Sequence, residues 1–340
     1  MKLVKKILRW FPFTILFTVL FSLNSAYGTE SLNLFRIGTG GKTGVYYPIG
    51  NLIAQGISNR SIVITKNKNE TAQPYFSIAQ NSGGSIDNVK GILNNEIEAG
   101  LVQADVAFWA FQGKNIFNND SRGNDLRAIA SLYPEKFQLV VRRDAKIQNM
   151  LDLKGKRISV DEFGSGTLSV VRIVLDAYGL KENDFQPVYL KPVYTHDKIE
   201  NGQLHGFAMM AGAPMEAVNK LLNIGITIVP IETRTASKIT KNYPYLVPGK
   251  IDSGIYPGIP ETSTIQVNAL LAVSKKMDED LIYKITEALW SDNTITLLKN
   301  GHPQGKAIGP STALKGLSIP LHPGAKRYYL QHPERFTGLK

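Results

Sequence analysis

The sequence predicts an α/β protein whose two lobes face each other across a ligand-binding cleft. Short β-rich runs alternate along the 340 residues with segments of helical periodicity, which is the pattern of βαβ units. The alternation occurs in two similar rounds, and each round has a glycine-rich turn between its first strand and its first helix. Two matching rounds in a chain of this length indicate two lobes rather than a repeat solenoid.

The first round of elements begins at the strand "LFRIG" (34–38), which ends in glycines. The next segment, 46–58, carries isoleucine and leucine at the spacing of one helix face. The same patterns predict parallel strands and helices onward to residue 111. The expected strands are 34–38, 61–66 and 98–103, and the expected helices are 46–58, 85–95 and 104–111.

The second round begins near residue 153. Its expected strands are 153–162, 185–191, 206–212 and 226–231, and its expected helices are 168–180, a segment that starts at 195, and 213–225. Two long β-rich runs, 126–143 and 264–275, are interpreted as crossovers between the lobes. A helix at 278–290 then returns the chain to the first lobe. We therefore predict a discontinuous lobe 1 (29–138 and 267–340) and a continuous lobe 2 (139–266).

The N-terminus has the pattern of a secretory signal peptide. Four basic residues precede an apolar run at 11–23, and small residues at Ala26 and Gly28 suit a cleavage site. The apolar run is shorter than the roughly 20 residues that cross a bilayer. We therefore predict cleavage after Gly28 and a periplasmic location, in preference to a permanent membrane anchor.

The composition narrows the classes of function. The chain contains no cysteine, which excludes disulfides and thiolate metal sites. Beyond residue 28, 35 basic residues outnumber 28 acidic ones, a net charge of +7. The basic residues are scattered among acidic ones and form no aromatic-basic run, which argues against nucleic acid as a partner. A modestly positive surface suits small anionic solutes.

The glycine stretch "FRIGTGGKTGVYYPIG" (35–50) is not a nucleotide site. A phosphate-binding P-loop needs glycine five residues before its Gly-Lys-Thr, and that position is Arg36. The dinucleotide pattern needs glycine where Thr43 stands. What the stretch shares with those motifs is a strand, a glycine turn and a helix start, whose free N–H groups attract anions.

A second turn of this kind, "DEFGSGTLSV" (161–170), occurs in the second round, where Ser165 and Thr167 add hydroxyl groups. Either turn alone could serve only to reverse the chain. If both turns face one cleft, they form a two-sided clamp. Hydroxyls and main-chain N–H groups bind carboxylates at reversible strength, so carboxylates are the expected ligands.

The ordered set of motifs resembles the substrate-binding receptors of TRAP transporters, specifically those of the TAXI type. The matching stretches extend from about Phe35 to about Tyr329, and any one of them alone is weak. They are "IGTGG…GVYYPIG", "SGGSIDN", "EAGLVQADVAFWA", "LKGKRISV…GSGT", "AYGL", "YPG" and "LHPGAKRYY". The resemblance implies a periplasmic-binding-protein-like fold of type II. It also implies delivery of a small organic anion, such as glutamate, glutamine or a dicarboxylate, to TRAP membrane subunits.

The resemblance also implies which residues line the cleft, with no cofactor and no metal among the expected partners. These residues are Thr39, Gly40, Gly41, Tyr46, Ser85, Gln103, Ser165, Gly166, Thr167, Ala211, Gly212 and Pro214. Tyr46 is expected to cover the aliphatic part of the ligand.

Several alternatives stay open on the sequence. Lys42 departs from the family's run of small residues, and it either reaches the ligand or extends into water. Asp105 either holds a ligand ammonium or caps a helix. The receptor could serve an ABC permease or a sensor instead of a TRAP permease. An exported hydrolase is a further alternative, although "EFGSGT" lacks the G-x-S-x-G pattern and no histidine pair has metal-binding spacing.

Overall fold

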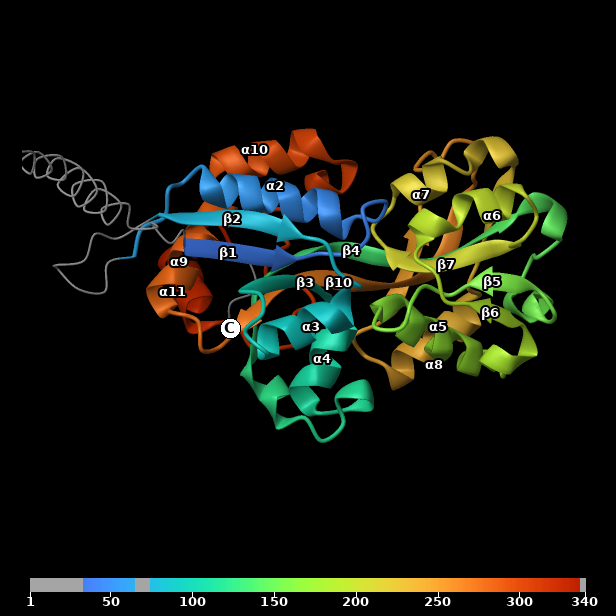
Figure 1. Ribbon diagram of the computed structural model, residues 1–340, viewed down its shortest axis with the longest axis horizontal. Helices are drawn as coiled ribbons and strands as arrows, with labels where there is room; N and C mark the ends of the chain where they lie inside the picture. The colour runs from blue at the N-terminus through green and yellow to red at the C-terminus, as the bar shows by residue number, and fades with distance from the viewer. Residues whose placement is uncertain (1–32, 65–73, 337–340) are drawn as a thin grey trace, which may run out of the picture.

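The computed structural model describes residues 33–64 and 74–336, so the predicted signal peptide lies outside the described residues. The strands form one mixed sheet in the order β2-β1-β3-β10-β4-β7-β5-β6, with β8 paired to β4 and β9 paired to β10. Figure 1 shows the sheet divided between two lobes. The long strands β4 (Leu126–Arg142) and β10 (Thr262–Ser274) pass through both of them.

The first lobe contains the N-terminal strands and the C-terminal helices. Its strands are β1 (Asn33–Gly38), β2 (Tyr75–Gln80) and β3 (Ala99–Gln103). Its helices are α2 (Tyr46–Ser58), α3 (Ser85–Leu93), α4 (Ala104–Gln112), α9 (Glu279–Leu289), α10 (Asp292–Gly301) and α11 (Pro323–Gln331). In Figure 1, α2 and α10 cover one face of the sheet, and α3 and α4 cover the other.

The second lobe repeats this layering with shorter elements. Its strands are β5 (Arg157–Ser159), β6 (Gln186–Val188), β7 (Gly206–Ala211), β8 (Ile226–Val229) and β9 (Val247–Ile251). Its helices are α5 (Gly166–Ala177), α6 (His196–Glu200), α7 (Glu216–Asn219) and α8 (Thr233–Asn242). Helices α6 and α7 cover one face, and α5 and α8 cover the opposite face (Figure 1).

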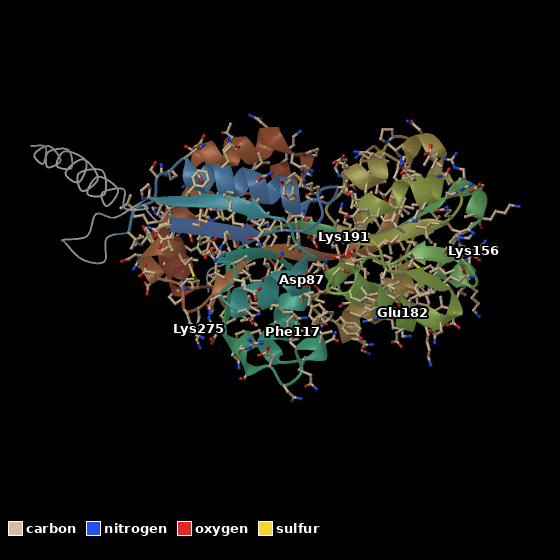
Figure 2. All side chains as sticks on the ribbon, viewed as in Figure 1. Asp87, Phe117, Lys156, Glu182, Lys191 and Lys275 are labelled. Carbon is tan, nitrogen blue, oxygen red and sulfur yellow. The ribbon has the colours of Figure 1, made fainter. Side chains whose placement is uncertain are left out.

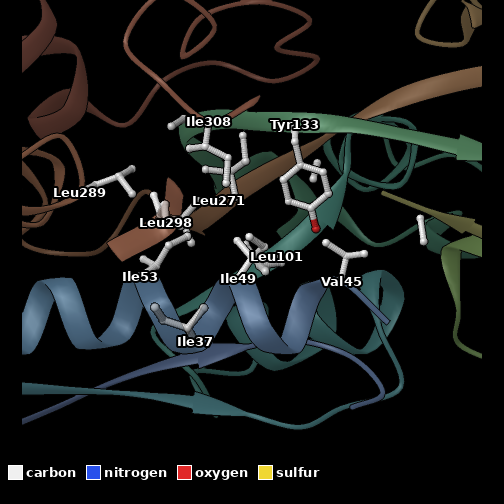
Figure 3. Packing of buried hydrophobic residues seen from close by; sticks show 14 of the residues in the cluster. Ile37, Val45, Ile49, Ile53, Leu101, Tyr133, Leu271, Leu289, Leu298 and Ile308 are labelled. Atoms are coloured by element: carbon white, nitrogen blue, oxygen red, sulfur yellow. The ribbon is translucent and has the colours of Figure 1, made fainter. Parts of the chain in front are cut away.

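The hydrophobic core consists of two layers, one on each face of the sheet, and both layers extend through the two lobes. Alternation along β4 explains this: Val140 packs into one layer, while its neighbours Leu139 and Val141 pack into the other. Figure 3 shows part of the first layer, where Ile49 and Ile53 of α2 face Leu101 and Leu271 of the sheet. The two crossover strands therefore lie between core layers that both lobes share.

The structure confirms most of the expected elements and corrects three expectations. The described residues of the expected strand 61–66 form no strand; β2, which pairs with β1, lies later in the chain. The expected helix 213–225 shortens to α7 and a 3-10 turn at Leu222–Ile224. The sheet is parallel only within each lobe, because β4 and β10 run antiparallel to their neighbours.

The predicted lobe boundaries fall inside these antiparallel strands. Residues 138/139 lie within β4, and residues 266/267 lie within β10. Across the described residues, no helix combines the length and the apolar character that a bilayer span requires.

Candidate functional site

A cleft lies between the two lobes, where the glycine-rich turns of both rounds meet. Its empty volume is about 580 Å³, including space that is open to solvent. The first lobe contributes the loops before α2 and α3, and the second lobe contributes the loop before α5. The floor of the cleft includes residues of the crossover strand β4 and of β7.

The first turn connects β1 to α2 through Gly40, Gly41 and Gly44. The Gly44 N–H donates to the Gly41 carbonyl at 3.1 Å, and the Asn81 side chain donates to the Gly40 carbonyl at 2.6 Å. These bonds engage the carbonyl groups of Gly40 and Gly41. Helix α2 begins after Val45 with no side-chain cap, so its first N–H groups have no partner within the helix, and Val45 and Tyr46 line the cleft.

A second helix of the first lobe, α3, also begins at the cleft. Its N-cap, Gly84, has a φ of 107°, a conformation that side chains other than glycine rarely adopt, and it provides no side-chain cap. The Ser85 hydroxyl accepts from the Gln103 N–H at 3.1 Å and lies 3.3 Å from the Tyr46 hydroxyl. This contact joins the starts of α2, α3 and α4.

The second turn leads from β5 into α5. Asp161 and Gly164 have φ values of 67° and 90°, and these conformations reverse the chain sharply. The Ser165 hydroxyl caps α5 by accepting from the Leu168 N–H at 3.2 Å. The Thr167 hydroxyl accepts from the Met210 N–H at 3.1 Å, which holds the start of α5 against β7.

Three helix starts therefore converge on one cleft. Each helix N-terminus acts as roughly half a positive elementary charge, because its first N–H groups have no partner within the helix. The ends of α2 and α3 lack side-chain caps, so their N–H groups can bind a ligand directly. The arrangement can hold negatively charged oxygen atoms without a basic side chain.

Nine of the twelve residues that the sequence places in the cleft line it in the structure. They come from both lobes and are Gly40, Gly41, Tyr46, Ser85, Gln103, Ser165, Gly166, Thr167 and Ala211. Gly166 and Gln103 belong to different lobes and nearly touch: a Cβ atom on Gly166 would lie 2.3 Å from the Gln103 Oε1. Glycine is required there for the lobes to approach this closely.

Thr39, Gly212 and Pro214 do not line the cleft. Thr39 is fully buried, and its hydroxyl donates to the Gln80 carbonyl at 2.7 Å, so it fastens β1 to β2. Gly212 packs against Tyr133 and Gln304, and Pro214 follows the buried Ala213, whose carbonyl accepts from Gln304. Ala211 ends β7 at the cleft, and the chain beyond it turns into the core.

The structure also places the two residues whose roles the sequence left open. Lys42 is exposed and its Nζ lies 6.0 Å from the centroid of the Tyr47 ring; it is not among the lining residues. Asp105 is fully buried behind the cleft. Its carboxylate oxygens have no hydrogen-bond partner, and α4 has no side-chain cap, so Asp105 does not act as the cap that the sequence offered as an alternative.

Three charged residues that line the cleft were not predicted from the sequence: Glu135 of β4, Asp161 after β5, and Lys191 after β6. Asp161 and Lys191 each follow a strand end, where ligand-binding residues gather in α/β proteins. Glu135 was signalled only as the acidic residue of a long β-rich run, next to Lys136. Met209 and Val193 add apolar surface to the wall formed by the second lobe.

Burial dominates the electrostatics of the two carboxyl groups. It raises the pKa of Asp161 to about 6, against hydrogen bonds from the Glu162 N–H and the Thr167 hydroxyl, which lower it. Burial likewise raises the pKa of Glu135 well above its usual value. Hydrogen bonding with Tyr46 opposes that rise, and the nearby Asp105 adds to it.

Lys191 connects the two lobes at the mouth of the cleft. Its Nζ lies 2.9 Å from the Glu162 Oε1 in its own lobe, and it donates to the Ser82 carbonyl of the first lobe at 3.1 Å. Figure 2 shows Lys191 and Asp87 at the boundary between the lobes. Asp87 of the first lobe approaches the second lobe at Gly164, where an added Cβ atom would lie 2.7 Å from the Asp87 Oδ1.

Replacing Lys191 with methionine is expected to separate the lobes. The change removes one charge-assisted hydrogen bond between them, worth about 1–2 kcal/mol for a partly exposed group. Small-angle X-ray scattering of the ligand-free protein should then give a larger radius of gyration. Lys220→Met, which breaks an exposed ion pair within α7 of the second lobe, is the matched control. Equal radii for the two variants would contradict this role of Lys191.

Two lobes joined by crossover strands, with a cleft at their junction, define a periplasmic-binding-protein-like α/β fold. Residues 37–331 match the NMT1-like family, and the chain belongs to this family. A solved structure from Bordetella bronchiseptica RB50 shares this fold, with a TM-score of 0.52 and 14% identity over 89% of each chain.

Two further solved structures are similar at lower scores. The periplasmic aliphatic sulphonate binding protein SsuA from Escherichia coli has a TM-score of 0.44 and 15% identity, over 80% of this chain and 75% of that one. A putative L-cystine ABC transporter from Listeria monocytogenes has a TM-score of 0.46 and 15% identity, over 79% of this chain and 94% of that one.

Proposed function

We propose that this protein is an extracytoplasmic receptor that binds a small organic anion in the cleft between its lobes. The ligand carries a carboxylate, as in glutamate, glutamine or a dicarboxylate. The observation that carries the proposal is the convergence of the α2, α3 and α5 N-termini on one cleft, two of them without side-chain caps. These ends attract negative charge from both lobes.

Binding and closure are coupled in this proposal. The first lobe offers the N–H groups after Gly41 and Gly84, and the second offers those after Ser165. A carboxylate touches both sets only when the lobes are close, so it stabilises the closed form. The contact between Lys191 and the Ser82 carbonyl adds to closure from the rim.

The proposed partner is the membrane part of a TRAP transporter of the TAXI type, with the receptor exported by the signal peptide at 1–28. The resemblance of the sequence motifs supports this partner, and an ABC permease or a sensor is the alternative. Uptake of radiolabelled ligand into proteoliposomes that contain TRAP membrane subunits should require the receptor. Uptake that requires an ABC permease instead would show that the receptor serves an ABC transporter.

A receptor role is favoured over hydrolysis by the arrangement around Ser165. Its hydroxyl oxygen accepts from the Leu168 N–H, which leaves the O–H able to donate to a ligand, and no histidine of the described chain lines the cleft to remove that proton. His196, Asp197 and Glu200 lie close enough to share a metal ion, but all three belong to α6, outside the cleft. A receptor returns its ligand unchanged, so mass spectrometry of the ligand after incubation separates the two functions.

Thermal unfolding tests the ligand class. Glutamate, glutamine and 2-oxoglutarate are to be added separately to the purified protein, because a ligand that binds only the folded state raises the melting temperature. At a hundredfold excess over Kd, the stabilisation is about 2.7 kcal/mol. Unchanged melting temperatures with all three would mean that the ligand class is wrong.

The double variant Ser165→Ala, Thr167→Ala is expected to weaken binding by more than tenfold while the fold persists. A hydrogen bond to a charged ligand is worth about 1.5–3 kcal/mol, and loss of the Ser165 cap costs about 1 kcal/mol of stability. Calorimetric titration measures the affinity. The control, Ser237→Ala with Thr240→Ala, removes two α8 hydroxyls of the same lobe outside the cleft. Equal affinity in both variants would remove this turn from the site.

A further inference from the structure

Glu135 is an acidic group at the floor of a cleft that otherwise suits an anion. It belongs to β4, where it pairs with Val267 of the other crossover strand, so it lies where the two lobes join. Its side chain is only 1% exposed, and its Oε2 accepts no hydrogen bond. A buried carboxyl oxygen without a partner is costly, and such groups are concentrated at functional sites.

The groups that face Glu135 come from every element packed around it. Tyr46 of α2 and Gln103 of β3 form hydrogen bonds with it, and Asp105 of α4 is close enough to repel its negative charge. The neighbouring Tyr133 of β4 is buried with an unpartnered hydroxyl (Figure 3). Within the described residues, Glu135 forms no ion pair, so no cation offsets its burial.

The opposite wall supplies no free positive side chain either. Lys191 is already paired with Glu162, and Asp161 adds a second carboxyl group. The positive potential of the cleft therefore comes from the helix starts. If Glu135 were ionised, its charge would oppose a bound carboxylate at close range in a partly enclosed cleft. A neutral carboxylic acid removes that repulsion, and its O–H becomes a hydrogen-bond donor.

We propose that Glu135 contacts the ligand as a neutral carboxylic acid and donates a hydrogen bond to the ligand's carboxylate. The proposal rests on the proposed function and adds that Glu135 is protonated when the ligand is bound. Where the free protein has lost the Glu135 proton, binding takes one proton from solvent. Where Glu135 is already protonated, binding takes none. The site thus selects carboxylates and does not need an amino group on the ligand.

The experiment compares 2-oxoglutarate, which has no amine, with glutamate, which has one. Calorimetric titrations from about pH 5.5 to about pH 9.5, in buffers of different ionisation enthalpy, give the affinity and the number of protons exchanged. For wild type, affinity for both ligands should fall up to tenfold per pH unit on the alkaline side, with one proton taken up. Infrared spectra of the ligand-free protein at about pH 8, where Asp161 and Asp105 (pKa about 6 and about 7) are mostly ionised, should still contain the band of a protonated carboxyl group.

Two variants test whether the exchanged proton belongs to Glu135. Glu135→Gln keeps a donor but cannot ionise, so its affinity should vary less than twofold over the alkaline range, and the infrared band should be lost. Asp105→Asn removes the charge that disfavours ionisation of Glu135, so the alkaline fall should begin at a lower pH. The proton count on wild type above about pH 8, where free Asp161 and Asp105 have already lost their protons, needs no variant and stands if Glu135→Gln does not fold.

Two results would overturn the proposal. Affinity for glutamate that rises with pH and collapses in Glu135→Gln would mean that an ionised Glu135 binds the ligand ammonium. Binding with no proton exchanged at any pH, together with no carboxylic acid band, would mean that Glu135 is ionised throughout. Failure of both ligands to bind at every pH would instead contradict the proposed function. The infrared band of the ligand-free protein at about pH 8, and its loss in Glu135→Gln, would then still decide the state of Glu135.

Discussion

Replacing Asn88 with alanine is expected to lower the free energy of unfolding by about 3–5 kcal/mol and to weaken ligand binding. Asn88 is fully buried in α3, behind the cleft. Its Nδ2 donates to the Thr39 carbonyl at 2.7 Å and to the Leu101 carbonyl at 2.8 Å, and its Oδ1 accepts from the Ser82 hydroxyl at 2.7 Å. Alanine removes three hydrogen bonds and leaves the Leu101 carbonyl without this partner.

The backbone around Asn88 is shaped to admit this side chain. A Cβ atom on Gly38 would lie 2.5 Å from the Asn88 Oδ1, and one on Gly100 would lie 2.8 Å from the Asn88 Cβ. Strands β1 and β3 therefore approach α3 closely because both carry glycine at the contact. Through Thr39 and Ser82, Asn88 holds in place the two loops that lead into α2 and α3.

Urea unfolding and calorimetric titration of Asn88→Ala test both expectations. Asn219→Ala, at an exposed position at the end of α7, is the control and should change stability by less than about 0.5 kcal/mol. A loss of stability with unchanged affinity would show that the loops keep their positions without Asn88. A stability equal to that of the control would contradict the network itself.

The local patterns of the sequence predicted the parts of the fold that depend on short-range structure. The strand, glycine turn and helix of 34–58 follow from adjacent residues, as does the turn before α5. Helix α8 was missed because it is mostly polar and buries only Ala236 and Ile239, which are too few apolar residues to mark a helix in the sequence. Strand β2 was missed because its position depends on pairing with β1.

The same distinction applies to the cleft. Main-chain N–H groups at helix starts could be predicted, because the turn that exposes them is encoded locally. Glu135 and Lys191 could not, because the role of each depends on how the lobes meet. Glu135 reaches the cleft only because β4 passes between the lobes in its particular register with β10. Gly212 and Pro214 were expected in the cleft because they follow Ala211 in the sequence, but the chain after Ala211 turns into the core.

Replacing Asp105 with asparagine is expected to stabilise the protein at alkaline pH by up to about 4 kcal/mol. Burial raises the pKa of Asp105 from 3.8 to about 7; the nearby Val106 and Asp105 backbone N–H groups, which do not reach hydrogen-bonding geometry, lower it only in part. The folded protein therefore binds a proton that the unfolded chain has lost between those two values. The contribution of Asp105 to stability is largest below about pH 4 and falls as pH rises to about 7, by roughly 1.4 kcal/mol per pH unit.

Urea unfolding at about pH 4 and about pH 8 measures this effect. Asp105→Asn should resemble wild type at the lower pH and exceed it at the higher pH, because asparagine never carries the charge. Asp197→Asn, at an exposed position on α6, should follow wild type at both values. An Asp105→Asn protein that is no more stable than wild type at the higher pH would show that Asp105 finds a partner for its charge.

A buried acid that lowers stability near neutral pH is best explained by its neighbour. Asp105 and Glu135 repel each other when both are ionised, so the presence of Asp105 favours the protonated state of Glu135 at the floor of the cleft. If that is its role, Asp105→Asn should be more stable at alkaline pH than wild type. Its affinity for the ligand should also begin to fall at a lower pH. A gain in stability with an unchanged pH profile of binding would separate the two carboxyl groups and leave Asp105 without a function in the site.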